Sequence, residues 1–261
     1  MKRYVLGSLV LGAMVALAGV AARADDVIKF GVAAEPYPPF SSKDASGKWV
    51  GFEIDLMDAV CAEMKAKCEL VETAWDGIIP ALLGKKIDVI WSSMTITDER
   101  KKTIDFTNKY YDTGAVFVGP KADAIKIDFD NPDSLKGKII GVQTSTIHAA
   151  FVQKRFGSTA SIKTYDTQDN ANADLVAGRV DLIMADMIAL DAFLKTDQGK
   201  DFEIKAKAPK DPILGGGVGG GVRKDDVALK EKLNAAIASI RANGEYGKIA
   251  KKYFDFDVYG S

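Results

Sequence analysis

The residues best suited to chemistry lie directly after a short apolar run at 87–91. Residues 92–97 carry four hydroxyl side chains, and Arg100 follows three positions later. Thr97 and Asp98 are both favourable helix N-cap types, which places Arg100 in the first turn of a short helix. A guanidinium beside hydroxyls and free backbone N–H groups suits a small carboxylate, because arginine can bind both oxygens at once. The same residues also suit a capped turn with a solvated arginine.

Apolar strands alternate with amphipathic helices along the chain, which predicts an α/β fold with parallel sheets. Phe52, Leu56 and Val60 recur at helical spacing, and Asp76 is the predicted cap of the next helix. Ligands of open sheets bind outside the carboxyl ends of the strands, where residues 92–100 fall. The predicted strands are 27–33, 69–73, 87–91, 138–142, 161–165 and 181–185, and the helices begin near 53, 77, 145, 169, 225 and 245.

Two α/β units are expected. Near 113–114 the alternation of strands and helices gives way to an extended stretch, and a charged segment at 121–138 then precedes the second unit. A glycine-rich run at 215–221 follows the second unit and has the composition of a flexible linker. A phosphate-binding loop would require a following Lys-Ser or Lys-Thr between a strand and a helix, and this run has neither.

The N-terminus predicts an exported protein. Lys2 and Arg3 precede the apolar stretch 4–21, and Ala-Arg-Ala at 22–24 is a cleavage signal, so residues 1–24 form the predicted signal peptide. The apolar stretch is barely long enough to span a membrane and ends in small residues, so no membrane insertion is expected. Cleavage removes three cations and no acid, which takes the formal charge from −1 to −4. A mildly acidic chain without a basic stripe argues against nucleic-acid binding.

Cys61 and Cys68 are the two cysteines of the chain. In an oxidising compartment they are expected to form a disulfide. On one continuous helix, cysteines seven residues apart would be separated by about 10 Å, too far for a bond. The helix that starts near Glu53 is therefore expected to end at about 65–67, and Cys68 to begin the next strand. A metal or redox pair is the rival interpretation, but a third ligand and C-x-x-C spacing are both missing.

Six motifs occur in an order and at spacings that resemble one protein family. The chain is similar to the polar amino-acid solute-binding proteins of ABC importers, bacterial extracellular solute-binding family 3, and most similar to the lysine/arginine/ornithine, histidine and opine binders. The resemblance extends to Lys-Lys-Tyr-Phe-Asp-Phe at 251–256. The motifs are Tyr-Pro-Pro-Phe-Ser at 37–41, Gly-Phe-Glu-Ile-Asp-Leu at 51–56, Trp-Asp-Gly-Ile-Ile-Pro at 75–80, the hydroxyl-rich segment 92–100, Gly-Val-Gln-Thr-Ser-Thr at 141–146 and Ala-Gly-Arg-Val-Asp at 177–181.

The resemblance implies a two-lobed periplasmic-binding-protein fold of type II, with a ligand cleft between the lobes. Lobe 1 would comprise 25–113 and 217–261, lobe 2 would comprise 114–216, and the glycine run would form the return crossing. It also implies a periplasmic monomer without a cofactor or metal. Such a protein captures a polar or cationic L-amino acid, or a derivative such as an opine, and delivers it to an inner-membrane ABC permease.

The family's carboxylate site matches three residues of this chain. Arg100 matches the arginine that holds the α-carboxylate of the ligand, and Thr95 matches the hydroxyl beside it. Thr146 matches the hydroxyl at the start of a lobe-2 helix, where backbone N–H groups and the helix dipole favour the same carboxylate.

The family's amino site matches three further residues. Ser92 and Ser93 match side chains that exchange hydrogen bonds with the amino-acid end of the ligand. Asp186 matches the acid that pairs with the α-ammonium, and its position after a buried strand suits a cleft charge. The same position also suits a helix N-cap.

The pocket for the ligand side chain matches less completely. Tyr37 and Trp75 match aromatic residues that enclose the ligand side chain, and their faces suit both apolar stems and cations. The basic-amino-acid and opine binders carry an acid three residues before the tyrosine, where this chain has Ala34. Glu35 is the nearest acid, but a shift of one residue on an extended segment reverses the direction of a side chain.

Two further residues are expected near the cleft. His148 matches a glutamine that binders of polar ligands use, although a solvent-facing position on the helix is an equal alternative. Trp91 replaces a small aliphatic residue and is expected to tighten the pocket.

The enzyme that shares this resemblance is an exported cyclohexadienyl dehydratase, which acts on arogenate or prephenate. It would need a general acid in the cleft, and Glu35 is the one obvious candidate. The chain has a single histidine, and neither G-x-S-x-G nor H-E-x-x-H occurs. The complete amino-acid clamp favours a binding protein over an enzyme.

Overall fold

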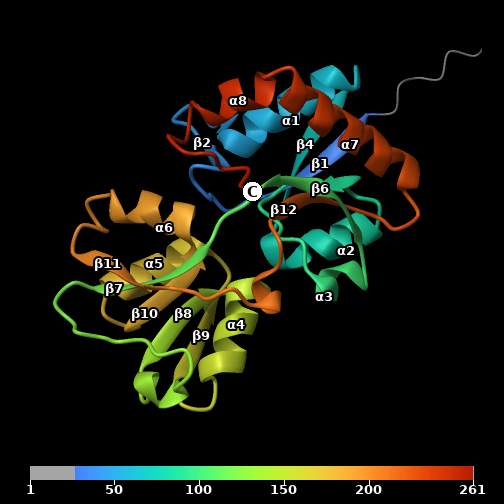
Figure 1. Cartoon of the computed structure of the whole chain (residues 1–261). Coiled ribbons are helices and arrows are strands. Elements are labelled where there is room, and N and C mark those ends of the chain that lie inside the picture. Colours follow the sequence, from blue (N-terminus) through green and yellow to red (C-terminus); the bar gives the residue numbers. More distant parts are fainter. Residues whose placement is uncertain (1–26, 261) are drawn as a thin grey trace, which may run out of the picture.

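The computed structural model describes residues 27–260, which form two lobes built on separate five-stranded sheets (Figure 1). The predicted signal peptide at 1–24 lies outside the described residues. Within 27–260, no helix has both the length and the apolar character needed to cross a membrane.

Lobe 1 contains a sheet of strand order β4-β1-β5-β12-β6, and a two-stranded hairpin of β2 and β3 lies beside it. Helices α1, α7 and α8 cover one face of the sheet, and α2 packs on the other. The strands are β1 (Ile28–Ala33), β2 (Ser42–Lys43), β3 (Trp49–Val50), β4 (Cys68–Thr73), β5 (Val89–Ile90), β6 (Asp105–Tyr111) and β12 (Val218–Val222). The helices are α1 (Phe52–Glu63), the 3-10 turn η1 (Trp75–Gly77), α2 (Ile78–Leu83), α3 (Asp98–Lys101), α7 (Val227–Ala242) and α8 (Glu245–Ala250).

Lobe 2 contains a sheet of strand order β11-β7-β10-β8-β9. Helix α4 covers one face, and α5 and α6 cover the other, so neighbouring residues Ile183 and Met184 of β10 enter different cores. The strands are β7 (Ala115–Pro120), β8 (Ile139–Gln143), β9 (Ser161–Tyr165), β10 (Leu182–Asp186) and β11 (Phe202–Lys207). The helices are the 3-10 turn η2 (Pro132–Leu135), α4 (Ile147–Phe156), α5 (Gln168–Val176), α6 (Met187–Leu194) and the 3-10 turn η3 (Pro212–Leu214).

Both sheets are mixed, which corrects the prediction of parallel sheets. Strands β4, β1 and β5 are parallel in lobe 1, and β8, β9 and β10 are parallel in lobe 2. Strands β7 and β12 run antiparallel to their neighbours. A strand that enters a lobe from the other lobe starts at the cleft and runs away from it, so its direction is opposite to that of the parallel core.

The chain passes between the sheets at 112–114, after β6, and again at 208–217, before β12 (Figure 1). The exact lobe boundaries at 113 and 217 stay a prediction. The glycine-rich run is no loose linker, because its second half is strand β12. A Cβ atom at Gly219 would lie 2.9 Å from the Ile96 side chain, and one at Gly220 would lie 3.1 Å from the Trp91 ring. Glycine therefore allows β12 to pack closely against Ile96 within the hydroxyl-rich segment and Trp91 directly before it.

The disulfide predicted between Cys61 and Cys68 is present, with the two Cα atoms 6.2 Å apart. Helix α1 ends at Glu63, two residues before the predicted range. Lys65 follows with φ 52°, a left-handed conformation that reverses the chain into β4. The end of the helix thus brings the second cysteine back within bonding distance.

The predicted helix cap at Asp76 is wrong. Asp76 lies inside the 3-10 turn η1, and the N-cap of α2 is Gly77, without a side-chain cap. Because residues 75–77 form this 3-10 turn, Asp76 lies one residue before the N-cap position of α2.

Candidate ligand-binding cleft

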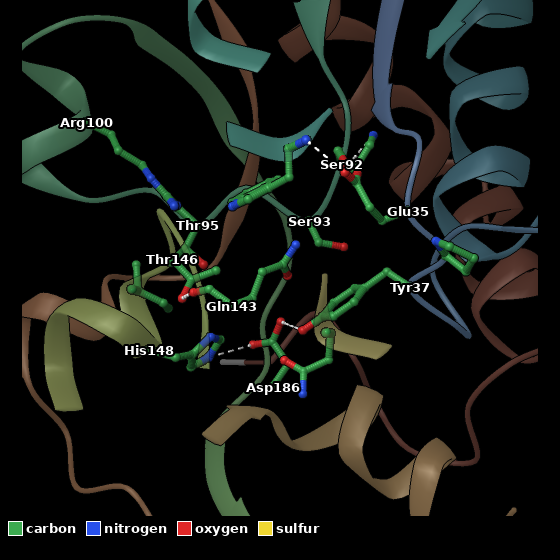
Figure 2. A pocket seen from close by; sticks show the side chains of 15 residues that line it. Glu35, Tyr37, Ser92, Ser93, Thr95, Arg100, Gln143, Thr146, His148 and Asp186 are labelled. Carbon is green, nitrogen blue, oxygen red and sulfur yellow. Dashed lines mark hydrogen bonds and ion pairs between the residues drawn. The ribbon is translucent and has the colours of Figure 1, made fainter. Parts of the chain in front are cut away.

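A cavity lies between the lobes at the carboxyl ends of parallel strands from both sheets (Figure 2). Its residues follow β1, β4 and β5 in lobe 1 and β8, β9 and β10 in lobe 2. All ten predicted binding residues line this one cavity, although their contact with a ligand stays a prediction. They are Glu35, Tyr37, Trp75, Ser92, Ser93, Thr95, Arg100, Thr146, His148 and Asp186.

Arg100 is held at the lobe-1 side of the cleft by a short, capped helix. The Thr97 hydroxyl accepts a 3.2 Å hydrogen bond from the Arg100 backbone N–H, which confirms the predicted N-cap of α3. The guanidinium donates to the carbonyl of Thr95 at 2.9 Å and to that of Ser145, in lobe 2, at 3.3 Å. Burial lowers the pKa of Arg100 to about 10, so the side chain stays charged at neutral pH. No carboxylate among residues 27–260 forms an ion pair with this charge.

Asp186 supplies the negative charge of the lobe-2 side. It ends β10 at the N-cap position of α6, but its side chain makes no cap bond to the helix. One carboxylate oxygen accepts a 2.8 Å hydrogen bond from the Tyr37 hydroxyl, and the other lies 3.6 Å from Nε2 of His148. Burial, together with the neighbouring Asp186, raises the pKa of Tyr37 well above its ordinary value. The Asp186 carboxylate therefore faces the cleft and makes no capping hydrogen bond to α6.

The first turn of α4 forms the floor of the cavity in lobe 2. Thr146 is the N-cap, and its hydroxyl accepts from Ala149 N–H at 3.0 Å and donates to the Gln143 carbonyl at 2.7 Å. The start of a helix of this length favours a negatively charged group. His148 is only 6% exposed, so its solvent-facing alternative is wrong, and its Nε2 has no hydrogen-bond partner within 27–260.

The two serines after β5 are fixed from the lobe-1 side. The Ser92 hydroxyl accepts a 2.9 Å hydrogen bond from the backbone N–H of Ala33. Ser93 adopts φ 53° and donates from both its backbone N–H and its hydroxyl to Glu53, each at 2.8 Å. Sequence reasoning missed Glu53 as a support of the site. The available signal was a carboxylate between the apolar residues Phe52 and Ile54 at the start of α1, both of which are buried.

Trp75 and Glu35 form part of the lobe-1 wall of the cavity. The Trp75 indole N–H donates to the carbonyl of Thr144 in lobe 2 at 3.1 Å, and its ring lies 5.7 Å from the Arg100 guanidinium. Glu35 lines the cavity, which removes the objection that its side chain would face away. Strand β1 ends at Ala33, so the alternation of side-chain directions no longer applies at Glu35. One Glu35 oxygen lies 3.5 Å from the backbone nitrogen of Trp75 (Figure 2). The other oxygen is buried without a hydrogen-bond partner in 27–260.

Trp91 does not line the cavity, which corrects the expectation that it tightens the pocket. Its ring is 1% exposed and stacks on Tyr110 with centroids 4.2 Å apart. The indole N–H donates to the backbone carbonyl of Glu53 at 2.9 Å. The side chain points into the lobe-1 core because the serines that follow it turn toward the cleft.

Two glutamines in the cavity were also missed. Gln143 ends β8 and donates to the Asp166 carbonyl at 3.0 Å, and Gln168 begins α5 and donates to Asn172 at 2.9 Å. Both follow the carboxyl end of a lobe-2 strand, which was the signal available in the sequence. Within residues 27–260, no group of three or more histidine, cysteine or carboxylate side chains is placed to hold a metal ion.

Residues 28–256 match the family described as bacterial extracellular solute-binding proteins, family 3. This chain belongs to that family. The L-arginine-binding protein of Pseudomonas aeruginosa is 47% identical over 241 residues, which cover 91% of this chain and 92% of that protein. The histidine-binding periplasmic protein of Escherichia coli is 42% identical over 265 residues, covering 100% of both chains. A solved structure of an ancestral arginine-binding protein bound to arginine has a TM-score of 0.80 and 36% identity, covering 87% of this chain and 98% of that one.

These relatives confirm the predicted resemblance and the two-lobed fold. The match extends over almost all of the described residues, so both lobes and the cleft between them belong to the shared architecture.

Proposed function

We propose that this solute-binding protein captures a polar or cationic L-amino acid in the periplasm and delivers it to the permease of an ABC importer. The observation that carries the proposal is the pair Arg100 and Asp186, which face one cavity from opposite lobes. Arg100 has no carboxylate partner within 27–260, so a ligand carboxylate can supply one. Asp186 can accept the α-ammonium of the same ligand, so one α-amino acid can bind both lobes at once.

The lining of the cavity favours a cationic ligand side chain. Glu35 holds a buried oxygen without a partner in 27–260, and Tyr37 and Trp75 offer aromatic surface beside it. The named arginine- and histidine-binding relatives agree with this preference. An opine keeps the α-carboxylate and a secondary α-ammonium, to which Arg100 and Asp186 can still bind.

A thermal-shift screen tests the proposal directly. The mature chain, from Asp25, would be screened against the common L-amino acids, D-arginine, agmatine and octopine. Ligand at 100 times its dissociation constant adds about 2.7 kcal/mol to the free energy of unfolding. Cationic L-amino acids should give the largest shifts, and agmatine, which lacks the carboxylate, should give none. If no amino acid or opine stabilises the protein, the proposal is wrong.

Binding without turnover is part of the proposal, and the dehydratase remains its alternative. Incubation of the purified protein with arogenate or prephenate, followed by detection of phenylalanine or phenylpyruvate, separates the two. The expected result is no product above the rate without protein. Export is tested with the full-length chain, by recovery of a shortened product in the periplasmic fraction of the expressing cells.

A further inference from the structure

A buried carboxylate lies directly behind the cleft. Glu53, in the first turn of α1, is 0% exposed. Its Oε1 accepts from the Ser93 backbone N–H at 2.8 Å and from the Tyr110 hydroxyl at 2.5 Å, and its Oε2 accepts from the Ser93 hydroxyl at 2.8 Å. No lysine or arginine of residues 27–260 pairs with it. Three donors and the positive end of α1 stabilise this charge in place of a cation.

These hydrogen bonds determine what Ser93 offers to the cleft. An ionised carboxylate can only accept, so the Ser93 hydroxyl must direct its hydrogen toward Glu53. The lone pairs of that hydroxyl stay available on its other sides, toward the buried Tyr111 hydroxyl and toward the cavity, which Ser93 lines (Figure 2). Ser93 therefore presents an acceptor, which suits an ammonium group and repels a carboxylate.

Glu53 also adds a second negative charge to the ammonium side of the cleft. Burial raises the pKa of Glu53, its hydrogen bonds from Tyr110 and Ser93 lower the pKa, and Asp186, from lobe 2, adds a smaller raising effect. Tyr37, which binds Asp186, experiences the charges of both residues. Closing the lobes brings the two carboxylates toward each other, and a cation between them offsets their repulsion.

We propose that Glu53 is a positioning residue of the ligand site. It orients the Ser93 hydroxyl as an acceptor for the α-ammonium and, with Asp186, makes the closed state more stable when a cation occupies that end. The inference rests on the proposed function and adds to it a residue that touches no ligand.

Acidification should weaken binding through this residue. A protonated Glu53 cannot accept all three hydrogen bonds, so Ser93 loses its orientation as the pH falls through the pKa of Glu53, which burial raises. The other ionisable groups that face Glu53 are Tyr110 and Tyr111 from β6 and Asp186 from β10. His148 lies beside Asp186, so His148→Gln is measured in parallel to separate its contribution.

The experiment compares two ligands that differ only in the α-ammonium. Affinities for L-arginine and for its des-amino analogue 5-guanidinopentanoate are measured by calorimetry on wild type and on Glu53→Gln. The amide nitrogen of glutamine is a donor, so one of the three donors that face Glu53 loses its acceptor. L-arginine affinity should fall more than tenfold, and the affinity of the analogue should change less than twofold. Asp58→Asn, which removes an exposed charge from the same helix, should change neither.

Two further variants keep the inference testable if Glu53→Gln folds poorly. Ser93→Ala should reproduce the selective loss of L-arginine affinity. The double variant should lose no more affinity than the more strongly affected of the two single variants. Tyr110→Phe removes a donor that stabilises the carboxylate, so it should move the acid limb of the affinity profile to higher pH. Equal weakening of both ligands, additive losses or an unmoved acid limb would overturn the inference. If wild type binds L-arginine and Glu53→Gln matches it, this inference alone is wrong, whereas failure of wild type to bind defeats the proposed function as well.

Discussion

The Tyr37 hydroxyl donates a 2.8 Å hydrogen bond to Asp186 across the cleft, so a single phenol joins the two lobes at the predicted ammonium site. Two more hydrogen bonds cross the cleft, from Trp75 to the carbonyl of Thr144 and from Arg100 to that of Ser145. The structure is therefore a closed conformation. An entering α-ammonium has to share Asp186 with Tyr37, and the following predictions test how that closed state depends on individual groups.

Removing the Tyr37 hydroxyl should weaken ligand binding without disturbing the fold. Tyr37→Phe keeps the ring that stacks on Phe40 but loses the bond to Asp186. A hydrogen bond to a charged group contributes about 1.5–3 kcal/mol, so calorimetry should show an affinity loss of at least about tenfold. Tyr253→Phe is the matched control, because its hydroxyl binds Asp55 on the outer surface of lobe 1. Equal affinities in Tyr37→Phe and wild type would show that the bond contributes nothing to the bound state.

Truncating Arg100 should abolish tight binding. Arg100→Ala removes the guanidinium, which has no carboxylate partner within 27–260, and should cost about 3 kcal/mol or more, over a hundredfold in affinity. Arg100→Lys should recover part of the loss, because a lysine keeps the charge but cannot bind both carboxylate oxygens in a fork. Lys101→Ala, one residue along the same helix, should bind normally and verify that α3 is intact. Near-wild-type affinity in Arg100→Ala, measured by calorimetry, would remove the central claim about the carboxylate site.

Ligand should shift the protein toward the closed state, with a smaller radius of gyration in solution scattering. Trp75→Phe keeps an aromatic ring over Arg100 but loses the indole N–H that binds Thr144. This variant should lower affinity by about 0.5–1.5 kcal/mol and leave the ligand-saturated radius unchanged. Trp49→Phe, which loses an indole bond to the surface residue Glu72, is its control. An unchanged or larger radius at ligand saturation would contradict closure on ligand, unless the free protein is already closed.

Glu35 should select for charge on the ligand side chain. Because one of its oxygens is buried without a partner in 27–260, Glu35→Gln should weaken lysine or arginine binding by about 1.5–3 kcal/mol. Neutral polar amino acids should bind almost as before. Asp76→Asn, at an exposed acid beside Trp75, controls for general charge effects. If cationic and neutral ligands respond alike to Glu35→Gln, selectivity rests on the shape of the cleft and on His148 instead.

Signals between near neighbours in the chain were predictable from the sequence. The Thr97 cap, the short helix that carries Arg100 and the Cys61–Cys68 bond each depend on residues within a few positions of one another. The shared position of the cavity-lining residues was also predictable, from the family's motifs and because these residues come after apolar runs that read as strands. Strand ends of this kind meet at one edge of a sheet whatever the order of the strands.

Only the tertiary structure decided which side chains face the cleft and which face a core. Trp91 and Ser92 are adjacent, yet one stacks on Tyr110 and the other lines the cavity. Glu53 reads as one of several acids in a helix, and its role depends on Ser93 and Tyr110, which lie 40 and 57 positions further along the chain. The reversed directions of β7 and β12 likewise follow from the two crossings between lobes. The physical reason is that burial and hydrogen-bond direction are set by partners distant in sequence, whereas caps, turns and strand ends are set by local backbone energetics.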